Sequence, residues 1–255
     1  CQCKLGELCW LATVSRPDIR ARLARISSRI NELTGMDVYR INELVKLVKQ
    51  WQPATVLKYA SSLQLDQIAR DVTVRHQKER IHGKAMTLVG WSDAAYGDTS
   101  CFGESRLGYI IGVSPSNLRG PCHIVQWTSR FTRKTVKSSL GGEIYAFSEM
   151  LDHMSMLREF YGHFKGLYPG LVGLEDCESL FTHLKKCKMI TEKFLVRHFL
   201  SIRQAIEELE LDNVYWIPGK ENPAGGLTKL HSELAPLLPL LESGSFSPGM
   251  LRPSK

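Results

Sequence analysis

The chain has 255 residues, of which 43% are hydrophobic and 23% are charged, a composition typical of globular proteins. No stretch approaches the roughly 18 consecutive apolar residues that a membrane-spanning helix needs, and seven scattered cysteines, an odd number, exclude a disulfide framework. The N-terminus has neither an initiator Met nor an apolar signal core. We therefore expect a fragment or cleavage product that is intracellular, cytoplasmic or nuclear, and neither secreted nor bound to a membrane.

The net charge of +7 is concentrated in the first third of the chain. Residues 1–90 hold 15 Lys or Arg and 8 Asp or Glu, a difference of +7, whereas residues 91–255 hold 18 of each. A basic surface suits a polyanion such as nucleic acid. A solvated helix surface has the same composition, so charge alone does not identify the partner.

Helical periodicity dominates the first part of the chain. Apolar residues at a spacing of three to four predict one amphipathic helix over residues 18–34 and a second over about 37–51. A short strand is predicted at 56–59, and the basic, polar stretch 70–84 is predicted to be a connecting loop. We therefore treat residues 1–84 as a small helical segment that precedes the main domain.

From residue 85 onward the pattern changes to strands and longer helices. The predicted elements, in order, are strands at 87–93, 108–114 and 123–128, a helix at 140–164, a strand at 171–176, helices at 178–187 and 191–210, a strand at 213–217 and a helix at 231–241. Tight turns join the first three strands into an antiparallel meander, and the later strand–helix–strand step adds a parallel strand through a right-handed crossover.

These elements predict an α/β fold, a mixed five-stranded sheet flanked by helices, over residues 85–242. The last residues, 243–255, contain Gly, Ser and Pro and few apolar side chains. Such a segment buries too little apolar surface to offset the entropy of ordering. We therefore predict a disordered tail there.

Three acidic residues fall where this fold brings side chains together. Asp93 and Asp176 end two strands predicted to be parallel neighbours, so both emerge at the edge where open sheets bind ligands. Glu143 lies one turn before Phe147, on the sheet-facing side of the long helix. Converging carboxylates repel one another unless a cation lies between them, and hard oxygen ligands select Mg²⁺ or Mn²⁺. Two such ions about 4 Å apart hydrolyse phosphodiesters, and we predict that chemistry here.

Each of the three acids also has an ordinary structural alternative. Asp93 suits a turn, Asp176 suits the N-cap of the following helix, and Glu143 is exposed if the helix phase shifts by one residue. Taken singly, these roles are the commoner ones. The joint placement at two strand ends and on one sheet-facing helix favours a metal site.

At these residues the sequence becomes recognisable through a series of short segments. In order, they are Gly6-Glu7-Leu8-Cys9-Trp10-Leu11-Ala12, Ser15-Arg16-Pro17-Asp18-Ile19, Trp91-Ser92-Asp93-Ala94-Ala95-Tyr96-Gly97, Gln126-Trp127-Thr128-Ser129-Arg130, Ser138-Ser139-Leu140-Gly141-Gly142-Glu143, and Tyr215-Trp216-Ile217-Pro218 with Leu227-Thr228-Lys229. Over roughly residues 5–230 they resemble the C-terminal part of copia-type LTR retrotransposon Pol polyproteins. The first two resemble the reverse transcriptase connection segment, and the others resemble the ribonuclease H domain.

The resemblance implies a ribonuclease H-like fold and an enzyme of the hydrolase class. It implies an endonuclease that cuts the RNA strand of an RNA–DNA hybrid with two Mg²⁺ ions, for which Mn²⁺ substitutes. Matched residue by residue, Asp93, Glu143 and Asp176 are the catalytic, metal-binding acids. The implied partners are the RNA–DNA hybrid and the polymerase part of the same polyprotein.

One position departs from the family pattern. The family carries a fourth acid, an Asp, directly after the residue that matches Ala224, and this chain has Gly225 there. Losing a carboxylate is expected to weaken one ion and to slow hydrolysis. The pair Gly141 and Gly142 near the start of the catalytic helix also costs about 1 kcal/mol per residue against Ala. The alternative is therefore a catalytically inactive nucleic-acid-binding module or a degenerate retroelement relic.

A basic stretch without acidic residues, 128–142, lies between the third strand and the long helix. The residues predicted to contact nucleic-acid phosphates are Arg130, Arg133, Lys134, Lys137, Ser138 and Ser139. Recognition there would be of backbone shape and 2′-hydroxyls rather than base sequence. A solvated basic loop is the alternative interpretation.

Overall fold

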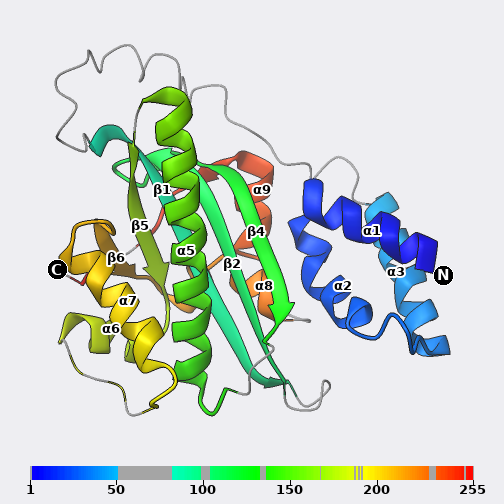
Figure 1. The fold of residues 1–255 in the computed structure, drawn as a ribbon. Helices are drawn as coiled ribbons and strands as arrows, with labels where there is room; N and C mark the ends of the chain where they lie inside the picture. Colours follow the sequence, from blue (N-terminus) through cyan, green and yellow to red (C-terminus); the bar gives the residue numbers. More distant parts are fainter. Residues whose placement is uncertain are drawn as a thin grey trace.

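A β-sheet with helices on both faces and a separate group of N-terminal helices make up the structure, a computed structural model (Figure 1). It describes residues 2–50, 82–98, 104–132, 136–166, 168–186, 188, 190, 192–229, 234–249 and 251–254. Across these ranges no helix is long and apolar enough to cross a membrane. The strand predicted at 56–59 and most of the loop predicted at 70–84 lie outside them.

The N-terminal part consists of three helices with an apolar core of their own. They are α1 (Gln2–Val14), α2 (Arg20–Ser27) and α3 (Gly35–Gln50), with the 3-10 turn η1 (Pro17–Ile19) between the first two. Their core is formed by Leu5, Leu8, Ala12, Ile19, Leu23, Ile26, Ile41 and Leu44. The helix predicted over 18–34 is shorter than expected, and the one predicted over 37–51 begins two residues earlier.

The main sheet is mixed and has six strands. Its members are β1 (His82–Asp98), β2 (Glu104–Pro115), β4 (His123–Phe131), β5 (Tyr168–Glu175), β6 (Asn213–Trp216) and β8 (Arg252–Pro253). The strand order is β4-β2-β1-β5-β6-β8. The β1–β2 and β2–β4 pairs are antiparallel, whereas β1–β5 and β5–β6 are parallel. The predicted meander, the parallel addition and the α/β class are confirmed; the strand β8 is additional to the five predicted.

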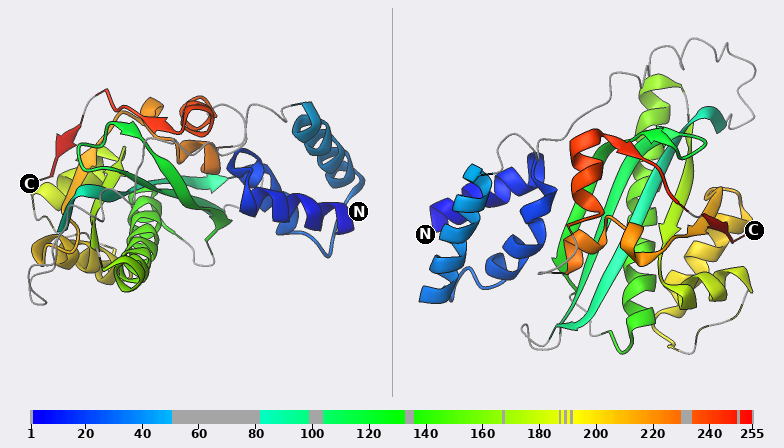
Figure 2. Two further views of the ribbon diagram at one scale, coloured as in Figure 1. Left: turned by 90° about the horizontal axis from the view of Figure 1, so that it is seen from above. Right: turned by 180° about the vertical axis from the view of Figure 1, so that it is seen from behind.

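Helices cover both faces of the sheet, as the view from above shows (Figure 2). One face carries α5 (Ser139–Lys165), α6 (Glu178–Lys185) and α7 (Val196–Glu207), and the other carries α8 (Gly225–Thr228) and α9 (Leu237–Ser243). Alternation along β1 separates two cores: Leu88 packs in the core shared with α5, whereas Val89 and Trp91 pack in the core shared with α8 and α9.

The last residues differ from the disordered tail that the composition predicts. Residues of β7 (Ser245–Phe246) pair with β3 (Gly120–Pro121), and β8 adds to the edge of β6. Two side chains hold this C-terminal segment against the rest of the domain. The Phe246 ring packs edge-on against Trp91 with 4.9 Å between centroids, and the Arg252 guanidinium lies 3.7 Å over the Trp216 ring.

The N-terminal helices contact the edge of the sheet that ends in β4. α2 packs against both β4 and α8, and the indole Nε1 of Trp127 donates a hydrogen bond of 2.8 Å to the carbonyl of Ala12. Within these helices, the buried Arg16 forms a two-point ion pair with Asp18. The helical segment therefore lies beside α8, which belongs to the candidate site described next.

Candidate active site

The parallel ladder between β1 and β5 places the two aspartates at matching positions. Its last residue pair is Trp91 with Leu174. Asp93 and Asp176 each stand two residues beyond that pair, on neighbouring strands that run in the same direction. Sequence analysis expected Asp93 to end its strand; β1 instead continues to Asp98, paired with β2. Both carboxylates nevertheless project where the two parallel strands separate.

The third acid, Glu143, reaches this place from the second turn of α5. Its side chain is 8% exposed, and Asp93 is 2% exposed. Burial, followed by repulsion from Glu175, Asp93 and Asp176, raises the pKa of Glu143 well above its ordinary value. Burial and then the Asp93 charge raise the pKa of Asp176 to about 6. The structure thus brings together the three acids that the sequence predicted to converge.

Two glycines allow α5 to approach the site. A Cβ atom at Gly141 would lie 2.7 Å from Cδ1 of Leu195 and 2.9 Å from Cγ1 of Val136, and one at Gly142 would lie 3.1 Å from Cβ of Ala94. The glycine pair, which costs helix propensity, therefore has a packing reason. Because α5 sits this close to β1, Glu143 reaches the carboxylates of the strand ends.

Residues at and after α8 hold Asp93 from the other face of the sheet. The Thr228 hydroxyl donates a hydrogen bond to Oδ2 of Asp93, and the Lys229 ammonium lies 3.5 Å from Oδ1. The same Thr228 hydroxyl lies 3.3 Å from the carbonyl oxygen of Gly225. Position 225, where the resemblance implies a fourth acid, is therefore next to the residue that touches Asp93.

The turn after β6 holds Asp176. A hydrogen bond from Asn222 lowers the pKa of Asp176, opposing the larger effect of burial. The Asn222 amide also donates to the carbonyl of Ser92 at 2.7 Å. A Cβ atom at Gly219 would lie 2.9 Å from Oδ2 of Asp176, so only glycine allows the backbone to come this close. The turn thus links the two strand ends.

A fourth carboxylate, Glu175, lies beneath the three predicted acids and was missed by sequence analysis. Its side chain is fully buried. The Ser92 hydroxyl donates to Oε2 at 2.7 Å, and the backbone N–H of Cys177 donates to Oε1 at 3.0 Å. Burial, followed by repulsion from Asp176, raises the pKa of Glu175 well above its ordinary value. Alternation along β5 places it on the opposite face from Asp176, so strand phase hid it.

The donor set suits a hard divalent cation. In the described part of the chain, Oε2 of Glu143 is buried without a hydrogen-bond partner, and such an orphaned oxygen is costly unless a cation meets it. Carboxylate oxygens are the ligands that Mg²⁺ and Mn²⁺ prefer. Among the described residues no three His, Cys, Asp or Glu side chains form a ready coordination group. Binding therefore requires these carboxylates to turn toward an ion.

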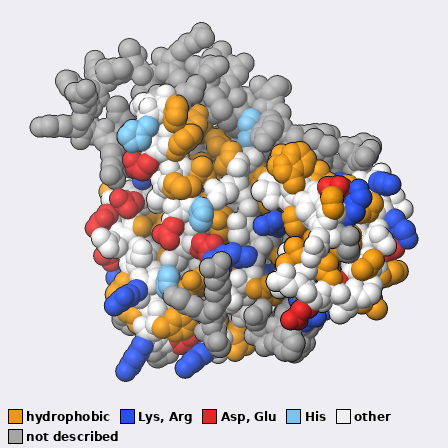
Figure 3. All heavy atoms as spheres, turned by 45° about the vertical axis from the view of Figure 1, so that its right-hand side comes forward, with side chains coloured by type: hydrophobic (Ala, Val, Ile, Leu, Met, Phe, Trp, Pro, Cys, Tyr) orange, Lys and Arg blue, Asp and Glu red, His pale blue; other side chains and the backbone are white. Residues whose placement is uncertain are grey.

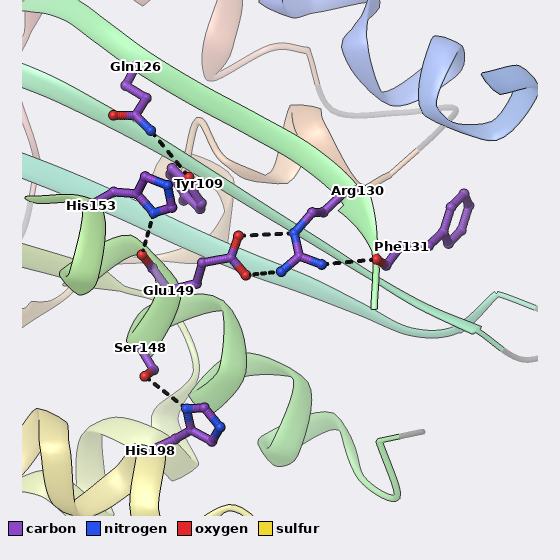
Figure 4. A network of polar contacts seen from close by, with 8 residues as sticks. All are labelled: Tyr109, Gln126, Arg130, Phe131, Ser148, Glu149, His153 and His198. Carbon is purple, nitrogen blue, oxygen red and sulfur yellow. Dashed lines mark hydrogen bonds and ion pairs between the residues drawn. The ribbon is translucent and has the colours of Figure 1, made fainter. Parts of the chain in front are cut away.

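The residues predicted to contact phosphates have varied surroundings, and Figure 4 shows those of one of them, Arg130. The Arg130 guanidinium forms a two-point ion pair with Glu149 on α5 and donates to the Phe131 carbonyl at 3.3 Å. Ser138 caps α5 by accepting the Gly141 N–H at 3.0 Å. Lys137 and Ser139 are exposed, whereas Arg133 and Lys134 lie outside the described residues. The pairing of Arg130 gives it a structural role that sequence analysis did not foresee.

Several basic side chains of the N-terminal helices form ion pairs with nearby acids. On the face that Figure 3 shows, Lys and Arg side chains lie among apolar ones over these helices. Four basic residues pair with acids close in sequence, in the pairs Lys4–Glu7, Arg16–Asp18, Arg40–Asp37 and Lys46–Glu43. These four basic side chains therefore have acidic partners within the segment, and the net positive charge resides on its other Lys and Arg residues.

No protein-family model matches the sequence, and no curated protein matches it. Similar solved structures include RNase H1 from the halophilic archaeon Halobacterium salinarum NRC-1, with 15% identity over 56% of this chain and 94% of that chain and a TM-score of 0.40. LC11-RNase H1 in complex with an RNA/DNA hybrid has 15% identity over 56% of this chain and 94% of that chain, with a TM-score of 0.41. Prototype foamy virus protease–reverse transcriptase has 12% identity over 74% of this chain and 23% of that chain, with a TM-score of 0.34. Likenesses at these identities and TM-scores establish no activity for this chain.

Proposed function

We propose that the chain is a divalent-metal-dependent endoribonuclease that cleaves the RNA strand of RNA–DNA hybrids, and that it derives from a copia-type retrotransposon polyprotein. The observation that carries this proposal is the convergence of Asp93, Glu143 and Asp176. The two aspartates stand at matching positions beyond the β1–β5 ladder, and Glu143 reaches them with a buried oxygen that has no partner among the described residues.

Each acid has a distinct part in such a site. Asp93 and Asp176, fixed by the turn and α8, would hold Mg²⁺ or Mn²⁺ between the strand ends, and Glu143 would add an oxygen from the helix. Two bound ions supply an activated water and stabilise the leaving oxygen of a phosphodiester. Lys229, 3.5 Å from Oδ1 of Asp93, offsets part of the negative charge.

A second candidate function is nucleic-acid binding without catalysis. Gly225 supplies no carboxylate where the resemblance implies one, and Lys229 already lies against Asp93. Both features weaken a site for two ions. This alternative predicts hybrid binding that metal does not enhance and that Gly225→Asp converts into cleavage.

The deciding experiment follows cleavage of an RNA strand labelled at one end within an RNA–DNA hybrid, with Mg²⁺, with Mn²⁺ and with EDTA. Single-stranded RNA, double-stranded RNA and double-stranded DNA serve as substrate controls. Wild type should cut only the hybrid and only with metal, and Asp93→Asn should not cut. The exposed Glu207, paired with Arg203 on α7, provides a matched control because Glu207→Gln should cut normally.

Absence of cleavage by folded wild type in both metals would overturn the enzymatic proposal. A gel-shift titration with the same hybrid then tests the binding alternative. Cleavage that persists in Asp93→Asn would instead indicate a contaminating nuclease or a different site.

A further inference from the structure

The two strand ends that carry the aspartates are joined by a side chain where their backbone pairing stops. The β1–β5 ladder ends at Trp91 with Leu174. At the next position on each strand, the Ser92 hydroxyl donates a hydrogen bond of 2.7 Å to the Glu175 carboxylate. A side-chain contact therefore continues the link between the strands one residue beyond the last backbone pair.

Both oxygens of this carboxylate are engaged on opposite sides. Oε2 accepts from Ser92, directly before Asp93, and Oε1 accepts from the backbone N–H of Cys177 at 3.0 Å, directly after Asp176. On the far side of β5, the Ile217 N–H donates to the Glu175 carbonyl at 3.0 Å, which fixes the same residue to the end of β6. Glu175 is thus held from three directions.

We propose that Glu175 is a positioning residue whose carboxylate links Ser92 to Cys177 through two hydrogen bonds, a link called the strap below. The strap sets the separation of the two neighbouring carboxylates, Asp93 and Asp176, and thereby the affinity of the site for a divalent cation. Hydrogen-bonded partners behind metal ligands commonly contribute in this way, and their loss typically weakens metal affinity or activity about 10–100-fold. The inference rests on the proposed function, because a preferred spacing matters only if the aspartates share ions.

The effect of replacing the buried Glu175 with an apolar residue distinguishes the strap from a role in packing alone. Glu175 is fully buried, and a buried ionisable group is costly to the fold, so an apolar side chain of similar size is often neutral or stabilising. A residue with only a packing role should therefore tolerate Leu. A strap should not, because Leu accepts no hydrogen bond. Metal affinity, more than stability, therefore distinguishes a strap from a residue that only packs.

Three variants of the full chain test the strap. Glu175→Gln keeps the shape: its carbonyl can accept from the Cys177 N–H while its amide donates to the Ser92 hydroxyl. Glu175→Leu removes both contacts, and Ser92→Ala removes one. Glu178→Leu is the matched control, because Glu178 is exposed, lies three residues away and forms a surface ion pair with Arg252.

The main readout is the affinity for Mn²⁺, titrated by electron paramagnetic resonance without nucleic acid. Glu175→Leu should bind Mn²⁺ about 10–100-fold more weakly than wild type, and Ser92→Ala about 10-fold. Glu175→Gln and the Glu178→Leu control should stay near the wild-type affinity. Urea unfolding of each variant shows whether the folded state persists. Loss of affinity in Glu175→Gln equal to that in Glu175→Leu would overturn the strap and indicate a role for the charge itself.

Hydrogen exchange at the Cys177 amide separates failure of the strap from failure of the proposed function. This amide should exchange slowly in wild type and Glu175→Gln, and about tenfold or more faster in Glu175→Leu. If wild type neither binds Mn²⁺ nor cleaves the hybrid, the proposed function fails while the exchange result still judges the contact. Unchanged exchange or unchanged Mn²⁺ affinity in Glu175→Leu overturns the strap.

Discussion

Replacing Glu143 with Gln should stabilise the metal-free protein while abolishing metal-dependent cleavage. The side chain is 8% exposed, and within the described structure its Oε2 has no hydrogen-bond partner. Leaving a buried polar atom unsatisfied costs about 1–3 kcal/mol, and more for a charged group. Gln has nearly the same shape, carries no charge and can donate to the neighbouring carboxylates. We therefore expect the free energy of unfolding to rise by about 1–3 kcal/mol at neutral pH.

The stability difference between wild type and E143Q should depend on pH, because Glu143 titrates and Gln does not. Burial, with repulsion from Glu175, Asp93 and Asp176, raises the pKa of Glu143 well above its ordinary value of 4.5. The folded state therefore binds this proton more tightly than the unfolded chain. Its contribution to stability is fully present below pH 4.5 and is lost as the pH rises through the folded-state pKa. E143Q lacks this titration, so the two proteins should have similar stability in acid and diverge as the pH rises.

Urea unfolding followed by tryptophan fluorescence measures the difference. Urea titrations in EDTA at about pH 5 and about pH 8 should show that the free energy of unfolding of E143Q, relative to that of wild type, is larger at the higher pH. Addition of Mg²⁺ should then stabilise wild type more than E143Q, because only a folded protein that binds the ion gains by mass action. An E143Q variant no more stable than wild type at the higher pH, or a gain as large in the exposed control Glu207→Gln, would refute the reasoning.

Three further predictions concern packing, charge and the C-terminal return. Gly141→Ala should destabilise by about 1–3 kcal/mol, because its Cβ would lie 2.7 Å from Leu195. Gly6→Ala in α1, where a Cβ would meet open space, should raise the free energy of unfolding by about 0.5–1 kcal/mol. Urea unfolding of the Gly141→Ala and Gly6→Ala variants measures the two effects, and equal effects would contradict the packing argument. Gly225→Asp should tighten Mn²⁺ binding measured by calorimetry but lower the urea midpoint in EDTA, since it adds a carboxylate to an acidic site; unchanged binding would place position 225 outside the site. Phe246→Ala should cost about 3 kcal/mol, because its ring packs 4.9 Å from that of Trp91; an unchanged thermal midpoint would show that the tail contributes nothing.

The central site could be predicted because it follows from strand periodicity. Val89, Trp91 and Asp93 alternate with Leu88 and Gly90 along β1, and that alternation fixes which face each side chain occupies. The order of elements then makes β1 and β5 parallel neighbours, so their ends coincide. Local pattern and topology together were sufficient to bring the aspartates to one place.

The C-terminal strands β7 and β8 could not be predicted, because single side chains anchor them. Phe246 against Trp91 and Arg252 over Trp216 are contacts between residues far apart in sequence. The surrounding Gly, Ser and Pro residues carry no periodicity that would reveal them. Composition describes the average tendency of a segment, whereas here two contacts determine its path.

The buried polar residues Glu175 and Asn222 were missed for a different reason. Their positions are set by partners on other strands, Ser92 above all. A polar residue in a strand pattern is ordinarily assigned to a solvent-facing side. Only the tertiary arrangement shows that Glu175 at the end of β5 and Asn222 in the turn after β6 are both buried and hydrogen-bonded to Ser92.

The charge of the site bears on the choice between nuclease and binding module. Four carboxylates, Asp93, Glu143, Glu175 and Asp176, lie close to one another in the site, and the Lys229 ammonium lies 3.5 Å from Oδ1 of Asp93. Without a cation, burial and mutual repulsion raise the pKa values of Glu143, Glu175 and Asp176. The negative charge that remains on the site repels nucleic-acid phosphates and costs folding free energy where it is buried. Neutral side chains would remove both costs in a module that only binds nucleic acid. A divalent cation would turn these carboxylates into ligands and would attract phosphates, so the arrangement supports the proposed metal-dependent chemistry even with Gly225 in place of a fourth acid.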